Sequence, residues 1–151
     1  MVEEVAGARV VFAALVDRKV KIQSVPVTGG TPALLLDDRA TNPAISPDGK
    51  SVACLRDMGE KGADLAVFDV NGGAPKVTKL EGMLYRWMPD GAVVYIKATD
   101  NAENLFTFKD DQVKQITQFT DGVIINLSVS AAGRILFTHV VETKDVVLLN
   151  P

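Results

Sequence analysis

Apolar residues along the chain are grouped into short runs, and turn residues separate the runs at intervals of about ten. Runs of this kind, rich in Val, Ile, Leu and Phe and bounded by Gly, Pro, Asn and Asp, are typical of β-strands. The three- and four-residue spacing of an amphipathic helix is hard to find. The pattern therefore predicts an all-β protein.

One turn recurs along the chain with a spacing of 42 residues. The stretch ISPDGKSVACL places Pro-Asp-Gly directly before an apolar run, WMPDGAVVYI repeats this arrangement, and VSAAGRILFT is a degraded third copy. The same step backwards reaches a glycine in VAGARVVFAAL. The four equally spaced register glycines are Gly7, Gly49, Gly91 and Gly133. Self-similarity at a fixed period predicts a repeat protein.

The strand that follows each register glycine is apolar on both faces. Val52 and Val94 lie three positions after their glycines, and Ala53 and Tyr95 come next. Such a strand must be covered on both sides. The same pattern predicts four strands per unit. The strands directly after the register glycines are expected at 8–16, 51–57, 92–98 and 135–141, and the second strands at 21–27, 64–70, 104–110 and 145–150. The third strands are expected at 32–36, 76–80 and 113–119, and the strands directly before the next register glycine at 41–46, 83–88 and 125–130.

Residues typical of hairpin turns lie between the second and third strands of the first three units. TGGTP and NGGAP contain Gly29-Gly30 and Gly72-Gly73, which predict tight primed turns because glycine adopts positive φ readily. Asp110-Asp111 takes this place in the third unit.

Four antiparallel strands in about 40 residues is the period of a β-propeller blade. Residues 1–151 are therefore assigned to one partial β-propeller of about 3.5 blades, fewer than the roughly four to eight of a closed ring. The chain is then a piece of a larger protein, or two copies complete one ring. Because an open end exposes an apolar blade face and a sheet edge, we expect self-association into a homo-oligomer.

The repeated residues resemble the TolB-type, WD-like propeller repeat of bacteria. PAISPDGKSVACL and DLAVFDVNGG carry the resemblance, YRWMPDGAVVYI is a second copy, and LSVSAAGRILF has lost the Pro-Asp. The tail ETKDVVLLNP is similar to the end of propellers at the carboxyl terminus of bacterial membrane-anchored serine/threonine kinases. The resemblance implies a sensor or scaffold segment, and an extracytoplasmic or periplasmic location. Such repeats also occur in TolB itself and in prolyl-oligopeptidase-type hydrolases.

Composition and charge restrict the partners. Apolar residues make up 47% of the chain, as in an ordinary folded protein, and the net charge is −3. Nucleic acids and anionic membranes require a basic surface, so neither is expected as a partner. No window approaches eighteen apolar residues, and no basic region precedes an apolar stretch at the amino terminus, so we expect neither a membrane span nor a signal peptide in this sequence. A single cysteine, Cys54, excludes an internal disulfide.

Catalytic and metal-binding patterns are missing from the sequence. His139 is the single histidine, it lies within an expected strand, and no Gly-x-Ser-x-Gly motif accompanies it. Ser46 belongs to the repeated turn. One His and one Cys do not make a zinc site, and Asp37-Asp38 and Asp110-Asp111 lack the spacing of a calcium loop. We therefore expect no enzyme activity, no metal and no cofactor.

A candidate binding site comes from the strands before the register glycines, which line the channel of a propeller. LYRWM departs from the repeat, because Arg86 stands where the other units have Ala44 and Ser128. Tyr85 and Trp87 occupy apolar positions and favour packing between blades. Since Arg and aromatic residues are enriched at binding hot spots, Arg86 and Tyr85 are the candidate binding residues.

The sequence thus favours a non-catalytic propeller segment that binds a protein partner or a small ligand at the channel mouth. The alternative is the regulatory propeller of a prolyl-oligopeptidase-type hydrolase whose catalytic domain lies outside this chain. A propeller enzyme with its site in the channel is disfavoured, because the strands expected there lack clustered His, Glu and Arg.

Overall fold

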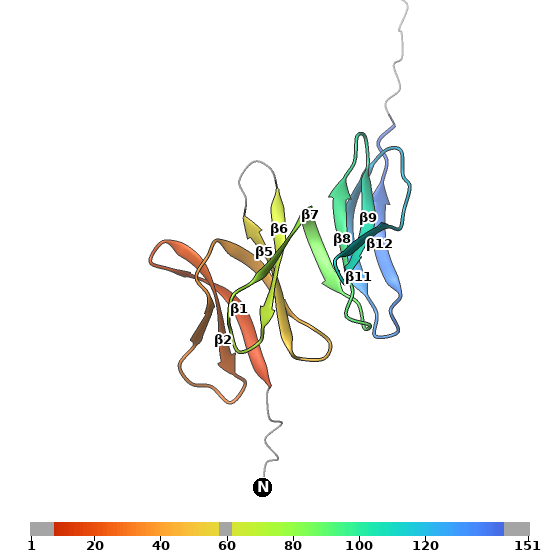
Figure 1. Ribbon diagram of the computed structural model, residues 1–151. Coiled ribbons are helices and arrows are strands. Elements are labelled where there is room, and N and C mark those ends of the chain that lie inside the picture. The colour runs from red at the N-terminus through yellow and green to blue at the C-terminus, as the bar shows by residue number, and fades with distance from the viewer. Residues whose placement is uncertain (1–7, 58–61, 144–151) are drawn as a thin grey trace, which may run out of the picture.

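The described residues, 8–57 and 62–143 of the computed structural model, contain β-strands and no helix (Figure 1). The prediction of an all-β fold is confirmed. The twelve strands are β1 (Arg9–Val16), β2 (Lys19–Pro26), β3 (Ala33–Leu36), β4 (Ala40–Ile45), β5 (Ser51–Asp57), β6 (Ala63–Asp69), β7 (Lys76–Trp87), β8 (Val93–Ala98), β9 (Glu103–Lys109), β10 (Gln112–Gln115), β11 (Val123–Val129) and β12 (Ile135–Val140).

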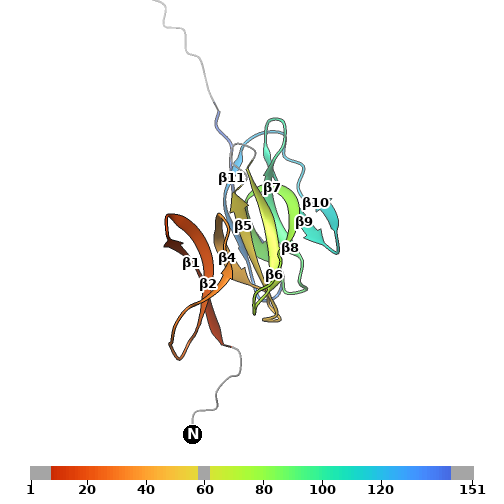
Figure 2. The ribbon, with the colours of Figure 1, turned by 60° about the vertical axis from the view of Figure 1, so that its left-hand side comes forward.

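The strands form three antiparallel sheets. β1, β2 and β3 make one sheet, and β11 and β12 make another. The remaining seven strands lie in the order β10-β9-β8-β7-β6-β5-β4. Within this sheet β7 has two partners: Lys76 pairs with Val67 of β6, whereas Trp87 pairs with Val93 of β8. The seven strands are therefore two blades that share one long strand, which crosses from one group to the other in Figures 1 and 2.

Four blades follow along the chain. Blade 1 is β1 to β3, and blade 2 is β4, β5, β6 and the first part of β7. Blade 3 is the second part of β7 with β8, β9 and β10, and blade 4 is β11 with β12. The sequence predicted two strands, 76–80 and 83–88, where the structure has the continuous β7. Gly7 and the expected strand 145–150 lie outside the described residues.

The core lies between successive blades, in three separate clusters. In the central strand β5, Val52 and Cys54 pack toward blade 1, whereas Ala53 and Leu55 pack toward blade 3. All four side chains are buried. The strand predicted to be apolar on both faces is therefore covered on both, as in stacked propeller blades. The main buried residues are Ile22, Leu36 and Phe68 in the first cluster, Leu65, Leu80 and Tyr95 in the second, and Val94, Leu105 and Leu127 in the third.

The turns at Gly49, Gly91 and Gly133 share one geometry. Their φ angles are 71°, 80° and 75°, in the left-handed region where a Cβ atom is unfavourable. Each glycine N–H donates to the carbonyl three residues earlier, on Ser46, Met88 and Ser130 respectively. The third turn keeps this geometry without Pro-Asp, and its Ser130 Oγ accepts from Arg134 N–H as Ser46 Oγ accepts from Ser51 N–H. The common conformation therefore does not require Pro-Asp.

Strand register after these turns differs by one residue between blades 2 and 3. Ala44 pairs with Ala53 in blade 2, and the equivalent Arg86 pairs with Val94 in blade 3. Ala53 follows its register glycine, Gly49, by four residues, whereas Val94 follows Gly91 by three. Since adjacent strand residues face opposite sides, Val52 and Val94, at the same spacing from a glycine, face opposite blades.

The two glycine pairs do not form the predicted two-residue primed turns. Both pairs have positive φ, but Gly29 N–H donates to Pro26 O, and β3 does not begin until Ala33. The connection runs from the end of β2 at Pro26 to the start of β3 at Ala33, and β3 pairs with β2 across a register shift. Two-residue turns with positive φ at both positions occur instead at Asp17-Arg18 and, as predicted, at Asp110-Asp111.

Cys54 provides a chemical probe of the contact between blades 1 and 2. Its side chain is fully buried, and burial, with the nearby Asp38 carboxylate, raises the pKa of the thiol to about 12. Because the thiolate is the reactive form, we expect an aromatic disulfide reagent near pH 8 to leave folded Cys54 unmodified. Full modification should follow in guanidinium chloride. Labelling of the folded chain at the rate of a free thiol would show that this contact opens readily.

Candidate binding site

Tyr85, in β7, joins blade 3 to blade 2. Its side chain is 3% exposed, and its hydroxyl oxygen lies 2.6 Å from Asn42 O and 2.7 Å from Ala53 O. Both carbonyls belong to blade 2, and the single hydroxyl proton can be shared between them. Burial raises the pKa of this phenol above its usual value. Tyr85 is thus placed as a neutral hydrogen-bond donor within the contact between the two blades.

Arg86, the next residue, has an exposed side chain. Its guanidinium Nη1 donates to the carbonyl oxygen of Tyr85 at 2.7 Å. Both residues line a shallow pocket of about 350 Å³, here called the strand pocket, between β4 and β7. The structure therefore brings the two predicted residues to one pocket: Tyr85 contributes to its wall, and Arg86 presents its charge to solvent.

Trp87, which follows Arg86 in β7, lies at the contact between blades 2 and 3. Its indole Nε1 donates to Ala44 O at 3.1 Å, and the partly buried ring packs against the cluster between blades 2 and 3. Packing between blades had been predicted from its apolar position. The structure adds that Trp87 also lines the strand pocket and two further pockets.

The two further pockets adjoin and form a surface here called the turn groove. We call the first of them the turn pocket and the second the side pocket, and each has a volume of about 350 Å³. Trp87, Asp90 and Gly91 line both pockets. The remaining residues of the turn pocket are Ser46, Pro47, Asp48, Ser51 and Pro89. Those of the side pocket are Val67, Lys76, Thr78, Val93, Phe108, Lys109 and Asp110. The turn pocket thus lies between the Pro-Asp-Gly turns of blades 2 and 3, and the side pocket lies next to it among residues of β6, β7, β8 and β9.

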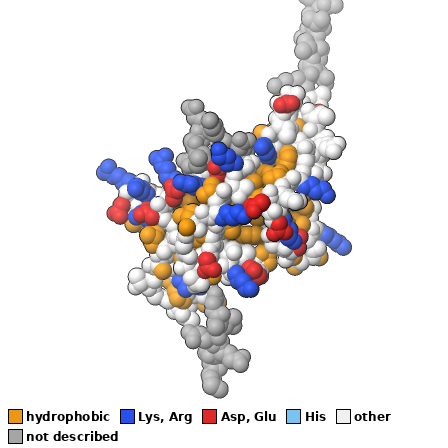
Figure 3. All heavy atoms as spheres, in the orientation of Figure 1, with side chains coloured by type: hydrophobic (Ala, Val, Ile, Leu, Met, Phe, Trp, Pro, Cys, Tyr) orange, Lys and Arg blue, Asp and Glu red, His pale blue; other side chains and the backbone are white. Residues whose placement is uncertain are grey.

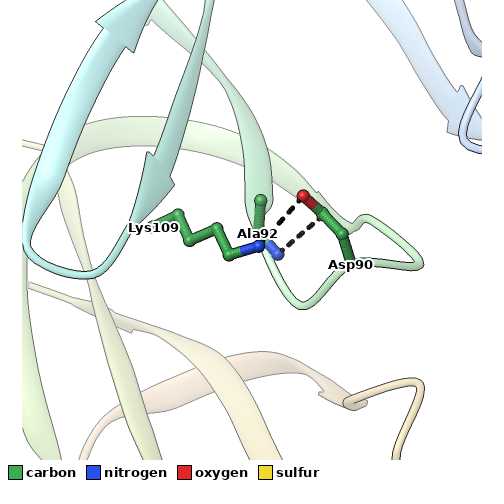
Figure 4. A network of polar contacts seen from close by, with 3 residues as sticks. All are labelled: Asp90, Ala92 and Lys109. Atoms are coloured by element: carbon green, nitrogen blue, oxygen red, sulfur yellow. Dashed lines mark hydrogen bonds and ion pairs between the residues drawn. The ribbon is translucent and has the colours of Figure 1, made fainter.

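Two aspartates, Asp48 and Asp90, are the charged residues that line the turn pocket. Asp48 Oδ1 accepts hydrogen bonds from Ser46 Oγ at 2.6 Å and from the N–H of Lys50 at 3.1 Å, which lower its pKa. Asp90 Oδ1 accepts from Ala92 N–H at 3.1 Å, and Asp90 Oδ2 pairs with Lys109 Nζ at 3.1 Å (Figure 4). These bonds lower the pKa of Asp90 as well. Both groups are therefore carboxylates at neutral pH, and both make the backbone bond expected of a turn aspartate.

The residues considered for catalysis have structural partners. Ser46 Oγ donates to Asp48 and accepts from Ser51 N–H at 2.9 Å, so its hydroxyl belongs to the turn. His139 lies in blade 4, where its ring stacks on Phe119 with centroids 3.9 Å apart and its Nε2 lies 2.9 Å from Asp121 O. Within residues 8–57 and 62–143, no three His, Cys, Asp or Glu side chains are grouped as metal ligands would be, and no helix could cross a membrane.

The fold is similar to that of several solved structures. A putative TolB from Agrobacterium tumefaciens matches with a TM-score of 0.75 and 24% identity, over 89% of this chain and 51% of that one. TolB from Acinetobacter baumannii matches with a TM-score of 0.60 and 16% identity, over 91% of this chain and 48% of that one. A puromycin hydrolase mutant matches with a TM-score of 0.65 and 19% identity, over 84% of this chain and 25% of that one.

The fold is a partial β-propeller. The chain spans about half the length of the two TolB structures and a quarter of the hydrolase. Similarity at this level of identity concerns the fold and leaves the activity open. No protein-family model matches the sequence, and a comparison with curated proteins gives no match either.

Proposed function

We propose that this chain is a non-catalytic β-propeller segment whose two end faces are covered by further blades and whose turns and first strands bind a partner. The exposure of equivalent residues in different blades supports the first part. Ala53, Val94 and Leu136 each pair with the matching position of the preceding strand, so they occupy equivalent places in blades 2, 3 and 4. Ala53 and Val94 are fully buried, whereas Leu136 is 72% exposed.

The opposite end of the blade stack shows the same contrast. Val10 in blade 1 pairs with Val25 as Val52 in blade 2 pairs with Phe68. Val10 is 48% exposed and Val52 is fully buried. Figure 3 shows hydrophobic side chains at the surface among charges of both signs. Since the repeat places an apolar residue wherever a neighbouring blade packs, the two end faces are suited to receive further blades.

The further blades are proposed to come from a longer parent chain or from a second copy. The contacts between blades within this chain show what such packing looks like, because blades 2 and 3 have apolar clusters on both of their faces. A role as the sensor or scaffold part of a bacterial membrane-anchored serine/threonine kinase is a finer proposal, which rests on the resemblance of the chain's tail alone.

Sedimentation velocity tests the end faces directly. The isolated chain should show a weight-average mass that rises with concentration, and an apolar dye should bind to it. Leu136→Glu places a charge on the blade 4 face and should shift the distribution toward monomer by about tenfold in dissociation constant. Val113→Glu is the matched control, since Val113 is 52% exposed but lies in β10 at the outer edge of blade 3. A wild-type chain that stays monomeric and binds no dye would contradict the proposal.

Binding by the segment is proposed to involve its solvent-facing charges. Arg86 is exposed beside the strand pocket and is the candidate for contact with a ligand or partner, while Tyr85 supports it through its carbonyl oxygen. The pocket lies between β4 and β7, the first strands of two adjacent blades, which line the channel in a propeller. A partner with a carboxylate could pair with this guanidinium there.

A second candidate function is that of a regulatory propeller in a hydrolase. The observation that favours it is the similarity to puromycin hydrolase over 84% of this chain. The two candidates differ in what the complete reading frame encodes next to this segment. An α/β-hydrolase domain would support the second, whereas a kinase domain with a membrane-spanning helix would support the sensor role.

A further inference from the structure

The turn groove has the dimensions of a ligand site. Its two adjoining pockets of about 350 Å³ each share Trp87, Asp90 and Gly91 in their linings. Small-molecule and side-chain pockets begin at roughly 300 Å³. Two neighbouring side chains of a bound segment could therefore enter the two pockets, one in each.

The turn pocket is suited to a cation. Asp48 and Asp90 contribute carboxylates to its lining, which contains no Lys or Arg. Asp90 is already paired with Lys109 of the side pocket, so Asp48 carries the carboxylate that is left for a ligand. Both turn hydrogen bonds of Asp48 use Oδ1, so Oδ2 is the oxygen that can accept from a ligand. The face of an indole ring also attracts cations. A guanidinium in this pocket would thus have a carboxylate oxygen to pair with, and Trp87 also contributes to the lining.

The side pocket is suited to an apolar side chain. Val67, Val93 and Phe108 line it together with Trp87. Lys109 is held at its rim by the ion pair with Asp90, as Figure 4 shows. An apolar residue of a partner could bury its side chain here while its backbone stays near the polar rim.

The repeat does not itself require this combination. At the positions of Trp87 and Asp90, the next unit has Val129 and Ala132. The turn of blade 4 keeps the same geometry through Gly133 without an aromatic ring or a carboxylate. The chemistry of the turn groove is thus particular to blades 2 and 3 and is not a general feature of the fold.

We propose that the turn groove binds an extended segment of a partner protein in which a basic residue stands next to an apolar one. The proposal rests on the binding role proposed above and specifies its ligand. The basic side chain enters the turn pocket beside Asp48, and the apolar side chain enters the side pocket beside Phe108. No end face of the blade stack takes part, so the proposal can fail while ring completion stands.

The chain's single tryptophan makes the test direct, because Trp87 is the sole source of indole fluorescence. The probes are the acetylated and amidated tetrapeptides Gly-Arg-Leu-Gly, Gly-Glu-Leu-Gly and Gly-Arg-Ser-Gly, titrated into the full chain. Gly-Arg-Leu-Gly should change the fluorescence saturably. The Glu peptide should bind at least about tenfold more weakly and the Ser peptide about threefold more weakly. Raising the salt concentration should weaken binding of the Arg peptide.

Two matched substitutions separate charge from fold. Asp48→Asn keeps an oxygen for the turn hydrogen bonds and should weaken binding of the Arg peptide by about threefold to tenfold. Asp69→Asn is the control, since Asp69 also accepts from a backbone N–H two residues on, at 2.8 Å, but does not line the groove. It should leave the affinity unchanged. The proposal is overturned by a flat titration, by equal binding of the Glu peptide, or by equal effects of the two substitutions.

Discussion

Asn104→Leu should lower the free energy of unfolding by about 3 to 5 kcal/mol, one of the largest effects of any single substitution in this chain. Asn104, in β9, is 1% exposed and uses its whole amide. Its Nδ2 donates to Thr99 Oγ1 and to Phe119 O, both at 3.1 Å. Its Oδ1 accepts from Thr117 Oγ1 at 2.9 Å and from Phe119 N–H at 2.7 Å. Leucine has a similar size but would remove all four hydrogen bonds, among them those to the half-buried Thr117 hydroxyl and Phe119 backbone, where losing a partner is costly.

The cost should extend beyond blade 3. Asn104 fixes Phe119, whose ring stacks on His139 and lies 6.0 Å between centroids from Phe137. Both of these residues belong to blade 4, so loss of the amide should also weaken the contact between blades 3 and 4. Denaturant unfolding followed by circular dichroism measures the change. Asn101→Leu, at an exposed position nearby, should stay within about 0.5 kcal/mol of wild type. A loss below about 1 kcal/mol for Asn104→Leu would contradict this role.

The pattern of apolar residues was sufficient to predict the blades, because burial on both faces leaves a direct trace in a strand. Val52 to Leu55 are apolar at every position, and the structure covers them from both sides. Asn104 leaves no such trace. A single asparagine at the start of an apolar run is also common at a strand end, and its burial depends on Thr117 and Phe119, which come from a later segment.

The placement of the candidate binding residues was predictable only in part. Arg86 was conspicuous because it breaks the repeat, and the structure leaves it exposed beside a pocket. The turn groove was not predictable, since Asp48, Trp87 and Asp90 each have an ordinary explanation within one repeat. Their combination depends on how blades 2 and 3 stack, and the sequence period alone does not define the space between blades.

The shared strand β7 was missed because Gly82 interrupts its apolar pattern. Gly82 pairs both with Ala63 of β6 and with Lys97 of β8, at the point where the strand leaves one blade for the next. Its φ is not in the left-handed region, so the backbone conformation alone does not require glycine. A Cβ atom there would lie 3.0 Å from Tyr95 Cδ2 and 3.1 Å from Ile96 O. The glycine is needed for close approach of the two strands.

Gly82→Ala should therefore destabilise the chain by about 1 to 3 kcal/mol. Replacing glycine where alanine fits usually stabilises by about 0.4 to 1 kcal/mol, so the close contacts decide the sign. The Tyr95 ring is 2% exposed within the cluster between blades 2 and 3 and has little room to move, and the Ile96 carbonyl is part of the backbone of β8. Denaturant midpoints measure the loss, and Gly82→Val should cost more than Gly82→Ala.

Two further variants identify the cause of the loss. Lys79→Ala, at an exposed position of the same strand, should change stability by less than about 0.5 kcal/mol. Tyr95→Leu removes the ring that the new methyl group would meet, so Gly82→Ala should cost less in that background, with a coupling energy of about 0.5 kcal/mol or more. If Gly82→Ala were neutral or stabilising in the wild-type chain, β7 would not be clamped where it crosses between blades, and the two blades it joins would be free to adjust around an ordinary strand.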